Sequence, residues 1–132
     1  MGAGASHGKR SASGLSAFHA AAMEGDLKRV HKLLGSKSLD VNEAEAKTGN
    51  VALHYASAKG HLEVVKTLLT DPRTDPNREN LHNTTPLILA AGNGQVEVVE
   101  ELLSCDRTNP DFESILGITA LRLACQRGKE AV

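Results

Sequence analysis

The chain has 132 residues, which is enough for one domain of ordinary size and too few for two. Hydrophobic residues make up 40% and charged residues 23%, a globular composition, while an aromatic content of 2% argues against base-stacking platforms. A net charge of −1 argues against a dedicated nucleic-acid binder, no apolar run approaches the roughly 18 residues of a membrane span, and two cysteines are too few for a disulfide scaffold. A cytoplasmic location is predicted.

The N-terminal segment, residues 1–10, is predicted to be flexible and carries a modification pattern. Residues 1–6 fit M-G-x-x-x-[ST], which makes Gly2 a candidate for N-myristoylation and predicts membrane association if it is modified. Lys9 and Arg10 follow as a short basic patch, and the serines after them are candidate phosphorylation sites, Ser11 and Ser13. The alternative is an unmodified leader of small residues.

Charge is distributed unevenly along the chain. Residues 1–38 carry six bases and two acids, a net of +4, whereas the remainder carries nine bases and fourteen acids, a net of −5. The chain is therefore an electrical dipole, which bears on its orientation and partners more than on its fold.

A repeat of 34 or 35 residues organises the chain from about residue 11. Glycines, large apolar residues and Leu-Leu pairs all keep this spacing: Gly25, Gly60, Gly94 and Gly128; Phe18, Leu53, Leu87 and Leu121; Leu33-Leu34, Leu68-Leu69 and Leu102-Leu103. A period in this range is typical of a solenoid of stacked units.

Each unit reads as two short helices and a loop. In the second unit, residues 52–59 are Ala-rich and predict a first helix, which Gly60 ends. A second helix follows, with an apolar stripe that recurs in the neighbouring units: Leu27, Val30, Leu33 and Leu34; Leu62, Val65, Leu68 and Leu69; Val96, Val99, Leu102 and Leu103. The polar segment at residues 75–84 predicts a projecting, hairpin-like loop. No helix pair is large enough to bury its apolar stripe alone, so the units are expected to stack.

Residues 85–94, Thr-Pro-Leu-Ile-Leu-Ala-Ala-Gly-Asn-Gly, resemble the ankyrin-repeat signature T-P-L-H-x-A-A-x-x-G. Residues 51–61 resemble it too, and weaker copies start at Ser16 and Thr119. The resemblance implies an all-α ankyrin-repeat solenoid over residues 11–132, with repeats at about 11–45, 46–79 and 80–113 and a partial fourth at 114–132. The signature histidine is replaced by Ile88 in the third copy and by Arg122 in the fourth, so its hydrogen bonds are expected to be lost there.

The ankyrin resemblance also implies a partner-binding groove, lined by loop tips and by the exposed faces of the first helices. Carried over position by position, the partner-binding residues are Lys47, Thr48, Asn50, Lys59, Leu81, His82, Thr84, Asn93, Ile115, Leu116, Ile118, Gln126 and Arg127. Residues 115–118 place three large apolar groups at a loop tip, where polar residues are usual, and this indicates a contact hot spot. The alternative is that these groups pack on each other or on the rest of the fourth repeat.

The leading hypothesis is a non-catalytic interaction module, a scaffold or adaptor that binds a partner polypeptide as a monomer. One alternative is an N-myristoylated, membrane-tethered adaptor or regulator anchored through Gly2; another is an ankyrin segment of a larger enzyme or channel. Neither a catalytic constellation nor a cofactor or metal site is predicted, because the six histidines do not cluster at ligand spacing with cysteines or acids.

Overall fold

A computed structural model describes residues 16–109, and its regular elements are six α-helices in three antiparallel pairs. Their bounds are α2 (Ala17–Glu24), α3 (Leu27–Leu34), α4 (Ala52–Lys59), α5 (Leu62–Thr70), α6 (Pro86–Gly92) and α7 (Val96–Ser104). These pairs coincide with the first three predicted units. None of the helices in this part of the chain is long and apolar enough to cross a membrane.

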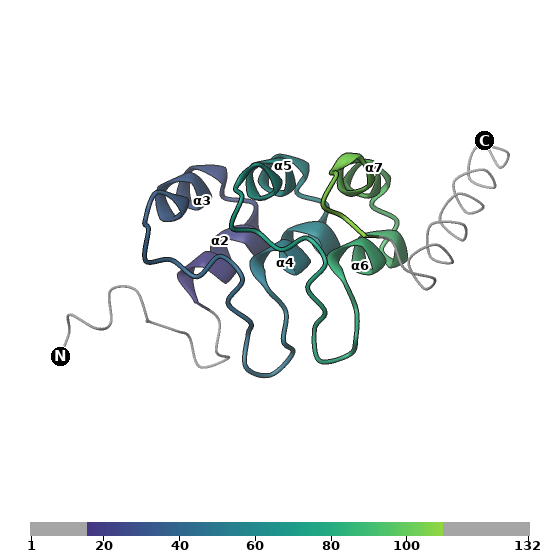
Figure 1. The fold of residues 1–132 in the computed structure, drawn as a ribbon, viewed down its shortest axis with the longest axis horizontal. Helices are drawn as coiled ribbons and strands as arrows, with labels where there is room; N and C mark the ends of the chain where they lie inside the picture. The colour runs from purple at the N-terminus through teal and green to yellow at the C-terminus, as the bar shows by residue number, and fades with distance from the viewer. Residues whose placement is uncertain (1–15, 110–132) are drawn as a thin grey trace, which may run out of the picture.

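The helices form two layers (Figure 1). The first helices of the pairs, α2, α4 and α6, lie side by side in an inner layer, and α3, α5 and α7 form an outer layer over them. The loops between the pairs project away from the outer layer. The predicted all-α solenoid of stacked helix pairs with projecting loops is confirmed.

Helix ends follow from local chemistry. The Ser16 hydroxyl accepts a hydrogen bond from the His19 amide (3.2 Å), and the Thr85 hydroxyl accepts one from Ile88 (3.3 Å), so both residues cap the starts of their helices. Gly25 and Gly60 end α2 and α4 with φ of 74° and 78°, a left-handed conformation that costs glycine little.

The core lies between the layers and between neighbouring repeats. Phe18, Leu53 and Leu87 are buried at equivalent positions of the inner helices, and Leu68 and Leu102 are fully buried on the outer ones. The expected outer stripe is wrong in detail: Val96 and Leu103 are each 37% exposed, while Val64 and Val98, absent from the predicted stripe, are buried. The buried face is turned in this way because each outer helix packs on the neighbouring outer helix as well as on its own partner.

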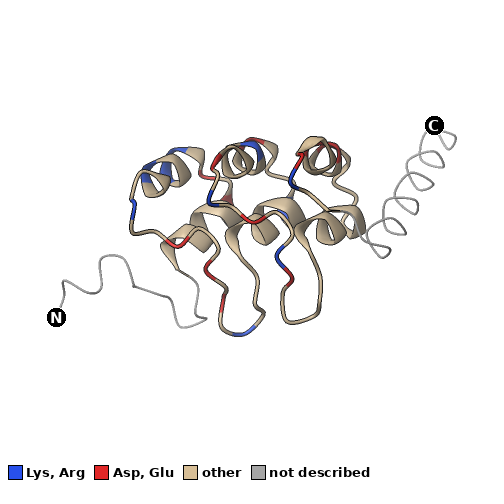
Figure 2. Cartoon of the chain, viewed as in Figure 1, with Lys and Arg blue, Asp and Glu red and all other residues tan. Residues whose placement is uncertain are grey.

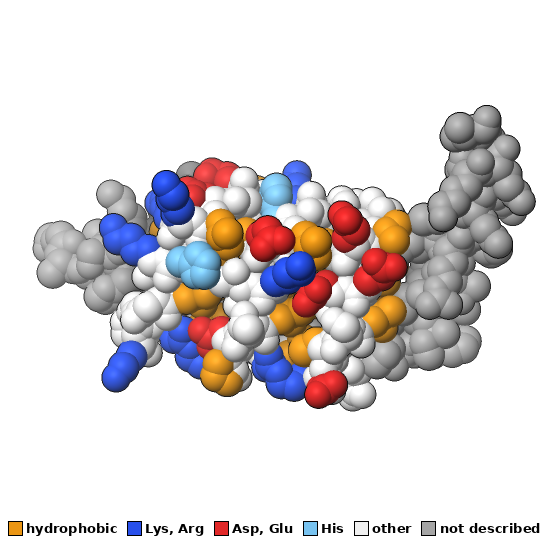
Figure 3. All heavy atoms as spheres, turned by 90° about the horizontal axis from the view of Figure 1, so that it is seen from above, with side chains coloured by type: hydrophobic (Ala, Val, Ile, Leu, Met, Phe, Trp, Pro, Cys, Tyr) orange, Lys and Arg blue, Asp and Glu red, His pale blue; other side chains and the backbone are white. Residues whose placement is uncertain are grey.

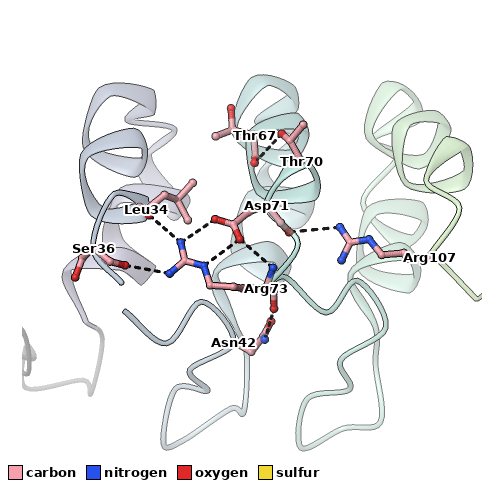
Figure 4. Close-up of polar contacts among 8 residues, drawn as sticks. All are labelled: Leu34, Ser36, Asn42, Thr67, Thr70, Asp71, Arg73 and Arg107. Atoms are coloured by element: carbon pink, nitrogen blue, oxygen red, sulfur yellow. Dashed lines mark hydrogen bonds and ion pairs between the residues drawn. The ribbon is translucent and has the colours of Figure 1, made fainter. Parts of the chain in front are cut away.

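Two arginines, 34 residues apart, tie each repeat to the one before it (Figure 4). The guanidinium of Arg73 donates to the carbonyls of Leu34 (2.8 Å), the last residue of α3, and of Ser36 (3.0 Å), just beyond it. Its ion pair with Asp71 (2.8 Å) orients it, and the hydrogen bonds from Arg73 hold the pKa of that carboxyl below its usual range. Arg107 makes the equivalent contact with α5, donating to the Leu69 carbonyl (2.6 Å), but Cys105 stands where the first arrangement has Asp71. Each cation also lies at a helix C-terminus, where the helix dipole favours it.

Replacing Arg73 by Lys is expected to lower the free energy of unfolding by about 1–2 kcal/mol, because one ammonium cannot serve both carbonyls and Asp71. Urea unfolding followed by circular dichroism measures the change. The matched control is Arg29→Lys, at an exposed position of α3. Equal stability of the two variants would contradict the role assigned to Arg73.

Asparagine side chains form a second ladder of hydrogen bonds between repeats, in addition to those of the two arginines. The side-chain amide of Asn42 donates to the Arg73 carbonyl (2.8 Å), and its side-chain oxygen accepts from the backbone amide of Asp75 (2.8 Å). Asn77, 35 residues later, bonds Arg107 and Asn109 in the same way (2.8 and 2.6 Å). The start of each projecting loop is therefore held in register with the next.

Candidate binding surface

The projecting loops are organised by one buried polar side chain each. In the first loop, Glu45 is buried, and one of its carboxylate oxygens accepts from the amides of Lys47 (3.1 Å) and Thr48 (2.8 Å) and from the Thr48 hydroxyl (2.8 Å). These hydrogen bonds, chiefly that from the Thr48 hydroxyl, lower the pKa of Glu45. Asn80, 35 residues later, does the same in the second loop, accepting from the amides of His82 and Thr84.

The backbone closes each loop as a hairpin. Glu45 donates to the Asn50 carbonyl (2.8 Å) and Asn80 to the Thr84 carbonyl (3.0 Å). Near each tip one residue takes the left-handed conformation: Gly49 with φ of 75° in the first loop and Asn83 with φ of 57° in the second. Asparagine tolerates this conformation better than other non-glycine residues, so the second loop keeps the turn without a glycine.

Adjacent loops are hydrogen-bonded to one another. The Leu81 amide donates to the Thr48 carbonyl (2.9 Å), and the Asn80 side chain donates to the Asn50 side-chain oxygen (2.8 Å). The Leu81 side chain is 67% exposed, the largest exposure among the large hydrophobic residues that the structure describes. Leu81 is therefore a fixed apolar projection on a polar loop.

The inner helices add a row of half-buried residues at equivalent positions: Ala20, Tyr55 and Leu89. Each lies two residues after a buried core residue, about 200° around the helix, and so faces away from the core. The ring of Tyr55 contacts that of His19 (centroids 5.7 Å apart). This row is not among the partner-binding residues predicted from the sequence, although its recurrence two residues after Phe18, Leu53 and Leu87 was a signal for it.

Two histidines attach the inner helices to the loops. His54 is buried; its Nδ1 accepts from the Val51 amide (2.9 Å), and its Nε2 donates to the Thr84 carbonyl in the next loop (2.8 Å). His19 makes the equivalent bonds to Ser16 and the Glu43 carbonyl. Ile88 takes this place in the third repeat, where the Thr85 hydroxyl caps the helix. At His19 and His54 the signature histidine therefore makes hydrogen bonds within the scaffold, which Ile88 cannot make.

The structure divides the expected partner-binding residues into two groups. Five are exposed: Lys47, Lys59, Leu81, His82 and Asn93. Three are partly buried and hydrogen-bonded within the scaffold: Thr48, Asn50 and Thr84. The others lie outside the described residues: Ile115, Leu116, Ile118, Gln126 and Arg127, as do Gly2, Ser11 and Ser13.

Charge follows the order of the outer helices (Figure 2). Lys28, Arg29 and Lys32 are exposed on α3, whereas α7 carries Glu97, Glu100 and Glu101. The outer surface is accordingly basic over the first repeat and acidic over the third (Figure 3).

Within residues 16–109, no group of three or more His, Cys, Asp or Glu side chains is arranged to hold a metal ion. The thiol of Cys105 is free and half-buried. The polar groups of this region instead build the loops and the contacts between repeats.

Stacked helix pairs, hairpin loops and recurrent polar ladders define a helical repeat scaffold that binds through its surface. The family described as ankyrin repeats (3 copies) matches residues 1–80 and 72–132. The chain belongs to the ankyrin-repeat family.

Comparison with solved structures finds 313 matching chains, so the fold is widespread and does not itself specify a partner. One match comes from the complex of the Bd0816 predatory endopeptidase of Bdellovibrio bacteriovorus with the immunity protein Bd3460. It is 31% identical, with a TM-score of 0.65, and the match covers 78% of this chain and 50% of that chain. This chain therefore spans half the length of its neighbour. No curated protein matches the sequence.

Proposed function

We propose that this protein is a non-catalytic adaptor that binds a partner polypeptide through the loop tips and the exposed face of the inner helices. Ankyrin repeats generally mediate protein–protein interactions, and the similar solved structure comes from a complex of two proteins. Both observations support a protein as the partner.

The observation that carries the proposal is the placement of Leu81. An apolar side chain that is 67% exposed gains free energy when a partner covers it, about 25 cal/mol for each Å² removed from water. The bond from its amide to Thr48 fixes its backbone before binding, so little conformational entropy is lost there on association. Exposed Lys47 and His82 surround it with polar groups, the usual composition of an interface rim.

Replacing Leu81 by Asp is expected to weaken partner binding by at least tenfold, about 1.4 kcal/mol, while the helix content is unchanged. The partner is first captured by the intact chain, and isothermal titration calorimetry then compares the variants. Leu103→Asp, which alters an exposed leucine on the outer helix α7, is the matched control. If both variants bind as the native chain does, the loop surface is not the site; Ile115→Asp with Leu116→Asp then tests the fourth repeat.

A second candidate function, membrane tethering, is favoured by the M-G-x-x-x-[ST] pattern at residues 1–6. One myristoyl chain binds membranes only marginally, so Lys9 and Arg10 would supply the second attraction, to anionic lipid. Mass spectrometry of the N-terminus after expression in eukaryotic cells is expected to show Gly2 acylated and Met1 absent. An unmodified Gly2, or a retained Met1, would reject tethering and leave the adaptor proposal untouched.

A third candidate is that this chain is an ankyrin segment of a larger enzyme or channel. In that arrangement the same surface would recruit a substrate or partner to the larger protein.

A further inference from the structure

Equivalent positions of the three outer helices carry charges that change sign along the solenoid. The three sets are Lys28, Glu63 and Glu97; His31, Lys66 and Glu100; and Lys32, Thr67 and Glu101. Counting every Lys, Arg, Asp and Glu on the helices, α3 has a formal charge of +3 and α7 of −3, while α5 carries the single pair Glu63–Lys66 (3.9 Å) and is neutral. Apart from Thr67 and Glu101, which are partly buried, the side chains in these sets are exposed.

A surface whose charge is antisymmetric about its middle is complementary to a second copy of itself. A two-fold rotation about an axis parallel to α5 brings α3 of one copy opposite α7 of the other, and α7 opposite α3. Both end contacts then join a basic helix to an acidic one. Because such a contact uses the same surface on both copies, it closes at two copies and does not continue into a chain.

We propose that the outer helices α3, α5 and α7 form a self-association face, which joins two copies of this protein back to back. This inference does not rest on the adaptor proposal. The loops project from the opposite side of each copy (Figure 1), so the candidate binding surfaces of both copies stay open.

The size of the face makes the dimer a weak one. Helices of eight or nine residues are roughly 13 Å long at about 1.5 Å per residue, and three of them packed about 9 Å apart cover roughly 350 Å² per copy. For the two copies together this is roughly 700 Å², below the usual range of specific interfaces, and exposed ion pairs contribute little and are screened by salt. The proposal therefore has the chain monomeric at physiological salt and paired at low salt and high concentration.

Sedimentation equilibrium of the full chain tests the proposal at ionic strengths of about 0.01 M and about 0.15 M, where screening lengths are about 30 and 8 Å. The native chain is expected to move from the monomer mass of 14.0 kDa toward twice that mass only at low salt. An acidic variant, Lys28→Glu with Lys32→Glu, and a basic variant, Glu97→Lys with Glu100→Lys, should each stay monomeric. An equal mixture of the two should form a heterodimer.

The control variant is Lys47→Glu with Lys59→Glu, which changes the net charge as the acidic variant does but alters the loop and inner-helix side. It should dimerise like the native chain. The proposal is overturned if the native chain stays monomeric at low salt, if its mass grows beyond a dimer, if the mixture does not associate, or if the control also loses pairing. Adhesion of the native chain to anionic vesicles, lost in the acidic variant and unchanged in the basic one, together with monomers throughout, would instead assign α3 to a lipid surface.

Discussion

Replacing Gly49 by Ala is expected to lower the free energy of unfolding by at least about 2 kcal/mol. Gly49 has a φ of 75°, a conformation that costs a residue with a Cβ roughly 1–2 kcal/mol. A Cβ here would also lie 2.7 Å from the Leu81 amide nitrogen and 2.9 Å from Leu81 Cγ. Backbone must therefore move, which breaks the bond from Leu81 to Thr48 and adds about 1 kcal/mol.

Gly94→Ala is the matched control for that experiment. Gly94 has nearly the same φ, 73°, but a Cβ there meets no atom within 4 Å, so only the conformational cost of about 1–2 kcal/mol is expected. Urea unfolding monitored by circular dichroism compares the two variants. Equal losses of stability would show that the contact between the two loops contributes nothing.

Replacing His54 by Leu is expected to lower the free energy of unfolding by about 2–3 kcal/mol. The leucine fills most of the space but leaves the buried Val51 amide without a partner, which costs about 1–3 kcal/mol, and it removes one of the two hydrogen bonds to the Thr84 carbonyl, worth about 1 kcal/mol. The same urea titration measures the loss. His82→Leu, at an exposed loop tip, is the control and should leave stability nearly unchanged.

The role of His54 has a pH signature. Burial lowers its pKa in the folded state below the ordinary value of about 6.5, so the unfolded chain takes up the proton first as the pH falls. The stabilising contribution of neutral His54 is complete above pH of about 6.5 and is lost as the pH falls through the lowered folded-state pKa. Unfolding free energies measured across this window should fall more steeply for the native chain than for His54→Leu. Parallel profiles would contradict this.

The repeat could be read from the sequence because local physics recurs with a fixed period. Gly60 ends α4 through the conformational freedom of glycine alone, without help from distant residues. The buried Leu53 and Leu68 lie on helix faces that helical spacing alone identifies. The loops were also foreseeable, since polar segments between the helix pairs have no stripe to bury.

The roles of individual polar residues could not be predicted because they depend on partners about 30 to 40 residues away. Thr48 and Asn50 occupy loop positions that suggest partner contact, yet the Thr48 carbonyl accepts from the Leu81 amide and the Asn50 side-chain oxygen accepts from Asn80. Arg73 has no sequence feature that distinguishes it from other surface arginines, because its partner Leu34 is 39 residues away and becomes its neighbour only on folding. The shift of burial from Val96 to Val98 likewise arises from packing on a neighbouring repeat, which the stripe of one helix does not encode.

The two loops differ in length, although the ladders on either side of them keep register. The first closes between Glu45 and Asn50 and the second between Asn80 and Thr84, one residue shorter, and Asn42 and His54 still reach their carbonyls in the following repeat. An inserted residue at a tip is thus absorbed without disturbing the stack. Evolution can lengthen or rewrite the tips while the rest of each unit stays fixed, so new specificities can arise at little cost in folding.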